Sequence, residues 1–152
     1  MKIRFIIILL TIPPVITSAQ VNRSSKDSIA VTQTLNNFVN ALSNLQIDKL
    51  REQFSEDATA FFPPSSKRMQ RANNRKEIES TFSGFFDNLK KQSISHLDIH
   101  PVDLRIQWLG NVAIASFHLN DPEQFGRRTV VLQKLKERWR IVHLHASAVK
   151  SH

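Results

Sequence analysis

The strongest constraint on this chain is a change in the spacing of its apolar residues after Gln92. Before that point, apolar side chains recur every three or four residues, as on one face of a helix. The clearest such series is Val31, Leu35, Phe38, Leu42 and Leu45. After Gln92, apolar and polar residues alternate, as between Val102 and Trp108, which is typical of a strand with one buried face. The chain is therefore predicted to fold as helices followed by a sheet.

Three helices are expected in the first part of the folded region. The first runs from Asp27 to residues 44–46, and the second is a short helix that Asp48 is predicted to cap. The third opens at Asn74, because Glu77 follows three residues later and the pair resembles a capping box. Each helix carries apolar residues along one side, so each is expected to contribute that side to a common core.

One early strand and a four-strand meander complete the prediction. The early strand covers residues 58–62 and is expected to stop at Pro63-Pro64, ahead of a polar, basic loop over 65–74. The strands of the meander are expected over residues 102–108, 112–119, 127–135 and 139–149. This order predicts an α+β domain in which a cone-like, curved antiparallel sheet wraps around the three helices.

Residues 1–19 have the three-part layout of a secretory signal peptide. A basic start leads into 12 mostly apolar residues, and a run of small residues then ends at Ala19. A membrane-spanning helix needs about 20 apolar residues, and Pro13-Pro14 would interrupt one. The alternative is an uncleaved anchor. We expect cleavage after Ala19, export to the periplasm or the medium, and no integral membrane segment in the mature chain.

The rest of the chain divides into a linker over 20–27 and a folded domain over 28–149. Removing Lys2 and Arg4 with the signal peptide lowers the formal charge from +8 to +6. The remaining basic residues are spread along the chain, whereas a nucleic-acid-binding protein usually concentrates them on one element. Because the basic residues are spread out, we expect no nucleic-acid partner. The chain also has no cysteine, which excludes a disulfide framework and thiolate chemistry.

Polar side chains are predicted to share one face of the last three strands. Pairing Leu135 with Trp139 around the final tight turn sets the register, since every second residue of a strand lies on the same face. The polar face then holds six candidate ligand-binding residues: His118, Arg127, Thr129, His143, His145 and Ser147. The opposite, apolar face is formed by Ala113, Ala115, Phe117, Val130, Leu132, Val142, Leu144 and Ala146.

Three interpretations of this polar face are open. It is the outer face of the sheet, hydrogen-bonded to solvent or across a dimer interface, or it is a pocket for a small polar or anionic ligand, with Arg127 as the charge partner. Histidines titrate near neutral pH, so in a pocket they can donate a proton or act as a base. In the third interpretation His143 and His145 bind a metal ion and His118 completes a three-nitrogen set. Apart from that alternative, no cofactor is predicted.

The final hairpin resembles a known family. The segments Gly126-Arg-Arg-Thr129 and Trp139-Arg-Ile-Val-His-Leu-His-Ala-Ser147 are similar to the C-terminal hairpin of SnoaL-like domains, in the superfamily of nuclear transport factor 2 and ketosteroid isomerase. The His-x-His-x-Ser ending also resembles the association domain of calcium/calmodulin-dependent kinase. Further similarities lie at residues 44–50, 54–57 and 109–113, so the resemblance extends over residues 28–149.

The resemblance implies a cystatin-like roll, a cone with an internal cavity and an outer surface through which such domains often form homodimers. It implies a small-molecule ligand in that cavity. The candidate lining residues are Phe61, Phe62, Trp108 and Arg128, with ordinary core packing as the alternative for the three aromatic side chains. The chain has no tyrosine, and the catalytic residues of ketosteroid isomerase cannot be placed, so enzymatic activity is left unassigned.

The expected function is that of an exported small-molecule-binding domain. The alternatives are a non-catalytic dimerisation module and a histidine-ligated metal protein. The direction of the histidines separates the first two functions: side chains that face the cavity favour a ligand site, and side chains that face outward favour an association surface.

Overall fold

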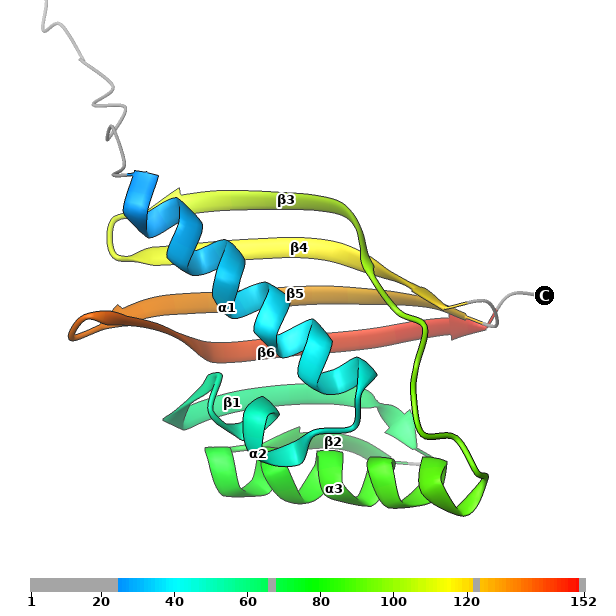
Figure 1. The fold of residues 1–152 in the computed structure, drawn as a ribbon. Coiled ribbons are helices and arrows are strands. Elements are labelled where there is room, and N and C mark those ends of the chain that lie inside the picture. Colours follow the sequence, from blue (N-terminus) through cyan, green and yellow to red (C-terminus); the bar gives the residue numbers. More distant parts are fainter. Residues whose placement is uncertain (1–24, 66–67, 122–123, 151–152) are drawn as a thin grey trace, which may run out of the picture.

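Three helices lie on one side of a six-stranded sheet in the computed structural model, which describes residues 25–65, 68–121 and 124–150 (Figure 1). The helices are α1 (Ser25–Ser43), α2 (Ile47–Arg51) and α3 (Arg75–Lys91). The strands are β1 (Phe54–Ser65), β2 (Arg68–Ala72), β3 (Pro101–Leu109), β4 (Val112–Asp121), β5 (Gln124–Leu135) and β6 (Arg138–Lys150). The predicted signal peptide over 1–19 and residues 20–24 of the predicted linker lie outside the described residues. None of the described helices is long and apolar enough to cross a membrane.

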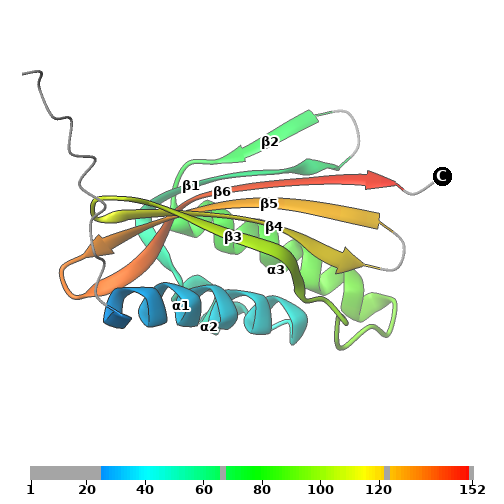
Figure 2. The same ribbon diagram turned by 90° about the horizontal axis from the view of Figure 1, so that it is seen from above.

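The sheet has the strand order β2-β1-β6-β5-β4-β3. The last four strands form the predicted antiparallel meander, whereas β1 runs parallel to β6. Figure 2 shows all three helices below the sheet, and Figure 1 shows α1 crossing the meander strands while α3 runs along β1 and β2. The predicted α+β class and the curved, helix-covered sheet are confirmed. The sheet is mixed, however, because its early strand pairs in parallel with the last one.

Part of the basic segment predicted as a loop is a strand. Arg68–Ala72 forms β2, which pairs antiparallel with β1 through Ala60–Ala72 and Phe61–Arg71. β2 is an edge of the sheet, and charged edge strands are a common way of preventing association with a further strand. The polar composition that indicated a loop is therefore equally compatible with an edge strand.

β1 is longer than predicted. It begins at Phe54 rather than Ala58 and continues through Pro63 and Pro64 to Ser65. The register with β2 shifts between Phe62 and Ser65. Proline cannot donate a ladder hydrogen bond, and such an irregularity is one of the few places where a strand accommodates it. The two prolines mark a bulge in the strand and not its end.

The third helix begins as predicted and the second does not. Asn74 is the N-cap of α3, and its Oδ1 accepts from the backbone N–H of Glu77 at 2.9 Å. In return, the backbone N–H of Asn73 donates to the Glu77 carboxylate at 2.8 Å, which lowers the pKa of that group. The N-cap of α2 is Gln46, and Asp48 lies within the first turn. A carboxylate there also faces the positive end of the helix dipole, so it favours the helix without capping it.

The core lies between the helices and the sheet. Phe38 of α1 meets Phe54 of β1 with ring centroids 5.8 Å apart and Phe82 of α3 at 6.4 Å, both edge to face. Phe38 is 0 % exposed and Phe54 1 %. The apolar stripes predicted from the helical periodicity therefore pack against the apolar face predicted from the strand periodicity.

A bulge in β6 changes the predicted register near the last turn. Leu135 pairs with Arg138 rather than Trp139, and the register shifts by one residue between Val131 and Leu132. On β6, Val142 is the extra residue; it is partly exposed, whereas its neighbour Ile141 is 0 % exposed. The prediction that Val142 belongs to the core face is therefore wrong. Beyond the bulge the predicted pairs are restored: Val131–His143, Thr129–His145 and Arg127–Ser147.

A second bulge lies in β3. The register shifts after Val102, and Asp103 has a positive φ of 54°. Val102 and Leu104 are 37 % and 40 % exposed, although the alternation predicted that both face the core. Beyond the bulge, Ile106 and Trp108 pack against the core as expected.

Candidate functional site

The histidines lie on the face of the sheet that no described helix covers, named the open face below. On the opposite face, Ala115 and Val130 are 0 % exposed and Leu144 is 1 % exposed. Their sequence neighbours point the other way, because side chains alternate along a strand, and Figure 2 shows that side of the sheet bare. The three histidines therefore point away from the helices and not toward the inside of the cone.

The register places the predicted ligand-binding residues in three adjacent rows across the open face. The first row consists of Gln107, Ile114, Val131, His143 and Thr59. The second consists of Arg105, Ser116, Thr129, His145 and Phe61. The third consists of Val102, His118, Arg127 and Ser147. All six predicted residues therefore share one face, and β1 adds two residues that the sequence did not group with them.

The two β6 histidines are positioned from β1. Thr59 Oγ1 and His143 Nδ1 are hydrogen-bonded at 2.8 Å. The ring centroid of Phe61 lies 5.9 Å from that of His143 and 6.0 Å from that of His145. These contacts follow from the parallel pairing of β1 with β6, which puts Thr59 opposite His143 and Phe61 opposite His145.

Titration of His143 is expected to reduce the stability of the fold in mild acid. Burial, and then the nearby charge of His145, lower the pKa of His143 below its ordinary value of 6.5. The unfolded chain therefore binds the proton more tightly, so stability is complete above about pH 6.5 and falls as the pH drops from there to the folded-state pKa. Urea unfolding of the wild type and of His143→Gln between about pH 7.5 and 5 measures this effect.

In the wild type, His143 should make the free energy of unfolding fall by at most about 1.4 kcal/mol per pH unit within that window, which is the limit for one proton. In His143→Gln this contribution should be absent. The matched control is His100→Gln, since His100 is exposed and lies in the segment between α3 and β3. An unchanged slope in His143→Gln would contradict the prediction.

His118 does not join the other two histidines. It lies on β4, and β5 separates β4 from β6, so about 10 Å of sheet lies between them. His118 instead faces Asp103, with Nδ1 and Oδ2 3.9 Å apart. Among the described residues, no group of three His, Cys, Asp or Glu side chains is placed to hold a metal ion. The structure does not assemble the three-nitrogen set of the metal interpretation.

The candidate cavity residues do not line one space. Phe61 lies on the open face, whereas Phe62 lies on the core side with its ring centroid 5.2 Å from that of Phe82. Trp108 also packs on the core side, 5.8 Å from Trp139 between ring centroids. However, β3 and β1 are four strand spacings apart, or about 19 Å. Strand alternation and strand order therefore separate residues that the sequence analysis had grouped.

Arg128, the fourth candidate, is anchored on the strand backbone. It lies opposite Ala146 on the core side, and its Nη1 donates to the carbonyls of Arg127 at 2.8 Å and Ser147 at 3.1 Å. Gly126 makes room for this arrangement, because a Cβ at that position would lie 3.1 Å from the Arg128 Nη1. The guanidinium thus links β5 and β6 beside Arg127 and Ser147, two residues of the predicted polar face.

A cleft with a volume of about 440 Å³ lies where β5 turns into β6. The start of β1 and the first residue of α3 form one wall, and the β5–β6 turn forms the other. The cleft is lined by Phe54, Ser55, Glu56, Asp57, Arg75, Leu135, Lys136, Glu137, Arg138 and Arg140. This volume is within the range of small-molecule sites, about 300–1,000 Å³.

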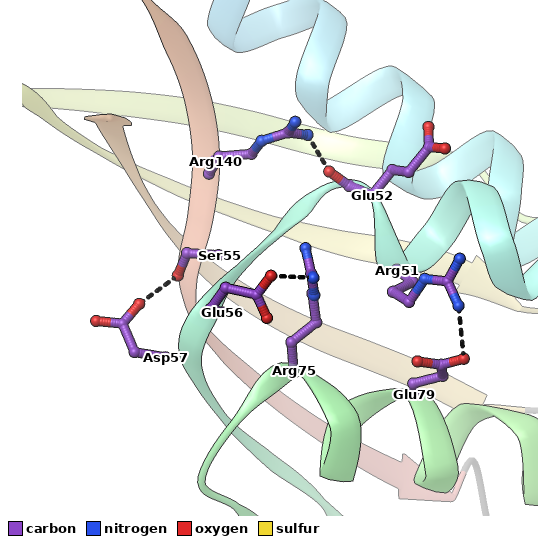
Figure 3. Close-up of polar contacts among 8 residues, drawn as sticks. All are labelled: Arg51, Glu52, Ser55, Glu56, Asp57, Arg75, Glu79 and Arg140. Atoms are coloured by element: carbon purple, nitrogen blue, oxygen red, sulfur yellow. Dashed lines mark hydrogen bonds and ion pairs between the residues drawn. The ribbon is translucent and has the colours of Figure 1, made fainter. Parts of the chain in front are cut away.

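Polar contacts fix the elements around this cleft (Figure 3). They are the ion pair of Arg75 with Glu56, the hydrogen bond from Arg140 to the backbone carbonyl of Glu52, and the ion pair of Arg51 Nη1 with Glu79 Oε1 at 3.0 Å. Together they join the end of α2 to β6, α2 to α3, and α3 to β1. The walls of the cleft are therefore held in place by their own side chains.

The cleft residues share no pattern in the sequence. Residues 54–57 drew attention only through the family resemblance, and residues 136–138 only as a turn. Charged residues at turns and strand starts are too common to indicate a site. Parallel pairing of β1 and β6, which are far apart in the sequence, brings the two segments together, and no local pattern predicts that pairing.

A sequence profile described as a SnoaL-like domain matches residues 31–151. Among curated proteins, no sequence matches the chain.

Solved structures share the fold at low identity. An NTF2-like protein of unknown function from Shewanella baltica has a TM-score of 0.69 and 16% identity, covering 86% of this chain and 100% of that chain. A protein of unknown function with a cystatin-like fold from Nostoc punctiforme has a TM-score of 0.68 and 12% identity, with coverages of 84% and 95%. An NTF2-like protein of unknown function from Methylobacillus flagellatus has a TM-score of 0.65 and 20% identity, with coverages of 85% and 97%.

Proposed function

The chain belongs to the SnoaL-like domain family, and from this premise we propose that it is an exported association module that pairs with a second copy through the open face of its sheet. One observation carries the proposal: the open face has partly exposed aliphatic residues at its centre and no described helix over them. Ile114 and Val131 form that centre, and the partly exposed Val142 lies beside them in the β6 bulge. A soluble domain normally covers such a face or uses it for binding.

The distribution of charge on the open face fits a protein interface. Histidine, threonine and serine surround the aliphatic centre, while Arg105 and Arg127 are exposed. Asp103 lies beside His118 near the β3 edge and supplies the opposite sign. Interfaces commonly combine a centre depleted of charge with a charged rim, and a rim with both signs allows two identical faces to meet with opposite charges opposed.

The size of the open face also fits a dimer. At the ordinary strand spacing and rise, the six strands together make a face of roughly 1,000 Å² per copy. Each partner contributes about 800 Å² to a standard stable interface, so the open face is large enough to supply one. The second copy is therefore an occupant of the right size.

Export is the part of the proposal that rests on the sequence. The basic start, short apolar stretch and small-residue run at 1–19 are typical of a cleaved signal peptide. Expression of the whole chain in a bacterium, followed by N-terminal sequencing of the exported protein, should give Gln20 as the first residue. An intact Met1 on protein retained in the cell would contradict export.

Sedimentation of the mature chain tests the association. We expect a dimer at about 10 µM, and we expect the His143→Gln, His145→Gln double variant to raise the dimer dissociation constant about tenfold or more, because both rings lie in the central rows. The double variant His96→Gln, His100→Gln is the control, since both of those histidines lie in the segment between α3 and β3 and not on the strands. A wild type that is monomeric up to about 100 µM would refute the association module.

Small-molecule binding is a second candidate function, favoured by the cleft beside the β5–β6 turn. Ligands that bind only the folded state raise its melting temperature. A panel of steroids, polyketide-like acids and sugars therefore tests this candidate. A flat panel, with a melting temperature that rises with protein concentration, would leave association as the function.

A further inference from the structure

Some charged side chains of the cleft already have ion-pair or hydrogen-bond partners, and others have not. Glu56 is engaged by Arg75. Asp57 accepts a hydrogen bond from Ser55 Oγ at 2.9 Å, and Ser55 itself is only 6 % exposed. Both carboxylates on the β1 wall therefore have partners, although both residues are exposed: Arg75 balances the charge of Glu56, and Asp57 keeps its charge. Cations that would attract an anion must come from the other wall.

The other wall presents mainly cations. Lys136 and Arg138 are exposed on the turn, and no described residue forms an ion pair with either. Arg140 uses one N–H on the carbonyl of Glu52, and a guanidinium carries five such donors. The exposed Glu137 is the single acid on this turn. The surplus on this wall is positive.

Apolar side chains complete the cleft. Phe54 borders it from the core side but is only 1 % exposed, so the apolar surface open to a ligand is that of Leu135, which is 36 % exposed and lines the cleft from the turn. A leucine with that exposure gains by being covered, since removing apolar surface from water is favourable. A ligand that fits both features has an apolar body and one anionic group.

We propose that this cleft binds a small organic anion, with its apolar body against Leu135 and its carboxylate or sulfonate bound by Arg138 and Arg140. Arginine suits this role because its planar fork matches the oxygens of such a group. The inference rests on the small-molecule candidate above and is independent of the pairing of two sheets, because the cleft lies at the β5–β6 turn and not on the rows of the open face.

The probe is 8-anilinonaphthalene-1-sulfonate, which combines an aromatic body with one anionic group. Binding to the native mature chain is followed by fluorescence, and the site is mapped by amide chemical shifts in NMR. We expect shifts at residues 54–57 and 135–140. The double variant Lys136→Gln, Arg138→Gln should weaken binding about tenfold, and Arg140→Gln by a similar factor, since each loses a charge-assisted contact.

Two controls distinguish binding at this site from non-specific electrostatic attraction and from non-specific apolar binding of the probe. The double variant Lys90→Gln, Lys91→Gln removes the same charge at the far end of α3 and should change binding less than about twofold. The neutral analogue N-phenyl-1-naphthylamine should bind the wild type more weakly than the sulfonate does. Its affinity should be the same for all variants. Circular dichroism confirms that the turn variants stay folded.

The proposal is overturned if the sulfonate does not bind the wild type, if the turn and Arg140 variants bind it unchanged, or if Lys90 and Lys91 matter equally. Shifts confined to other residues would overturn the anion site while keeping small-molecule binding. Sedimentation of the turn variants should show the same dimer as the wild type, so failure of the association module is recognised separately.

Discussion

Replacing Phe38 with alanine is expected to lower the free energy of unfolding by about 3–5 kcal/mol, the usual range for removing a buried phenylalanine. Phe38 is 0 % exposed and meets two other rings edge to face, Phe54 at 5.8 Å and Phe82 at 6.4 Å. These rings belong to α1, β1 and α3, so the truncation leaves a cavity where three elements meet. A domain of this size has a total stability of about 5–15 kcal/mol, so the variant is expected to be close to unfolding at 37 °C.

Urea unfolding at neutral pH measures the loss. The matched control is Phe85→Ala, because Phe85 lies on α3 near Phe82 but is 44 % exposed. Its truncation should cost less than about 1.5 kcal/mol. Equal losses in the two variants would show that the interior is not packed around Phe38 as described.

Replacing Val131 with aspartate is expected to raise the dimer dissociation constant at least about 100-fold, because a charge would lie unpaired at the centre of the paired open faces. Val131 lies between Ile114 on β4 and His143 on β6. It is partly exposed in the single chain, so the monomer has far less to lose from the change than the dimer does. Sedimentation over about 1–100 µM measures the effect.

The conservative variant Val131→Thr separates association from folding. It keeps the β-branched shape that favours a strand and adds no charge, so its dissociation constant should change less than about tenfold. Urea unfolding of the aspartate variant should show that its monomer remains folded. An aspartate variant that is folded and dimerises like the wild type would place the interface elsewhere.

Local patterns predicted most of the secondary structure. The helical spacing of Val31, Leu35 and Phe38 identified α1, and the Asn74–Glu77 pair located the start of α3. In the last hairpin, alternation placed Arg127, Thr129 and Ser147 on the face of the histidines. These features depend on residues close in the sequence or joined by one tight turn, and such interactions leave a periodic signal.

The features that were missed depend on contacts between distant residues. β2 is a strand because it pairs with β1. Its basic composition is compatible with an edge strand and with a loop alike. The bulges at Asp103 and Val142 each add one residue to a strand, and one residue is enough to move a side chain to the other face. Strand alternation puts Phe61 and Phe62 on opposite faces of β1, and the strand order places Trp108 four strand spacings away from both.

The sequence by itself determined that the chain has an apolar and a polar strand face, which residues belong to most of each, and that its family is that of SnoaL-like domains. Only the tertiary structure decided that the helices cover the apolar face, that the histidines therefore point outward, and that a cleft forms between β1 and the β5–β6 turn. The physical reason is the range of the interactions. Periodicity reflects which side of an element is buried, whereas parallel pairing of β1 with β6 joins residues that no local pattern relates.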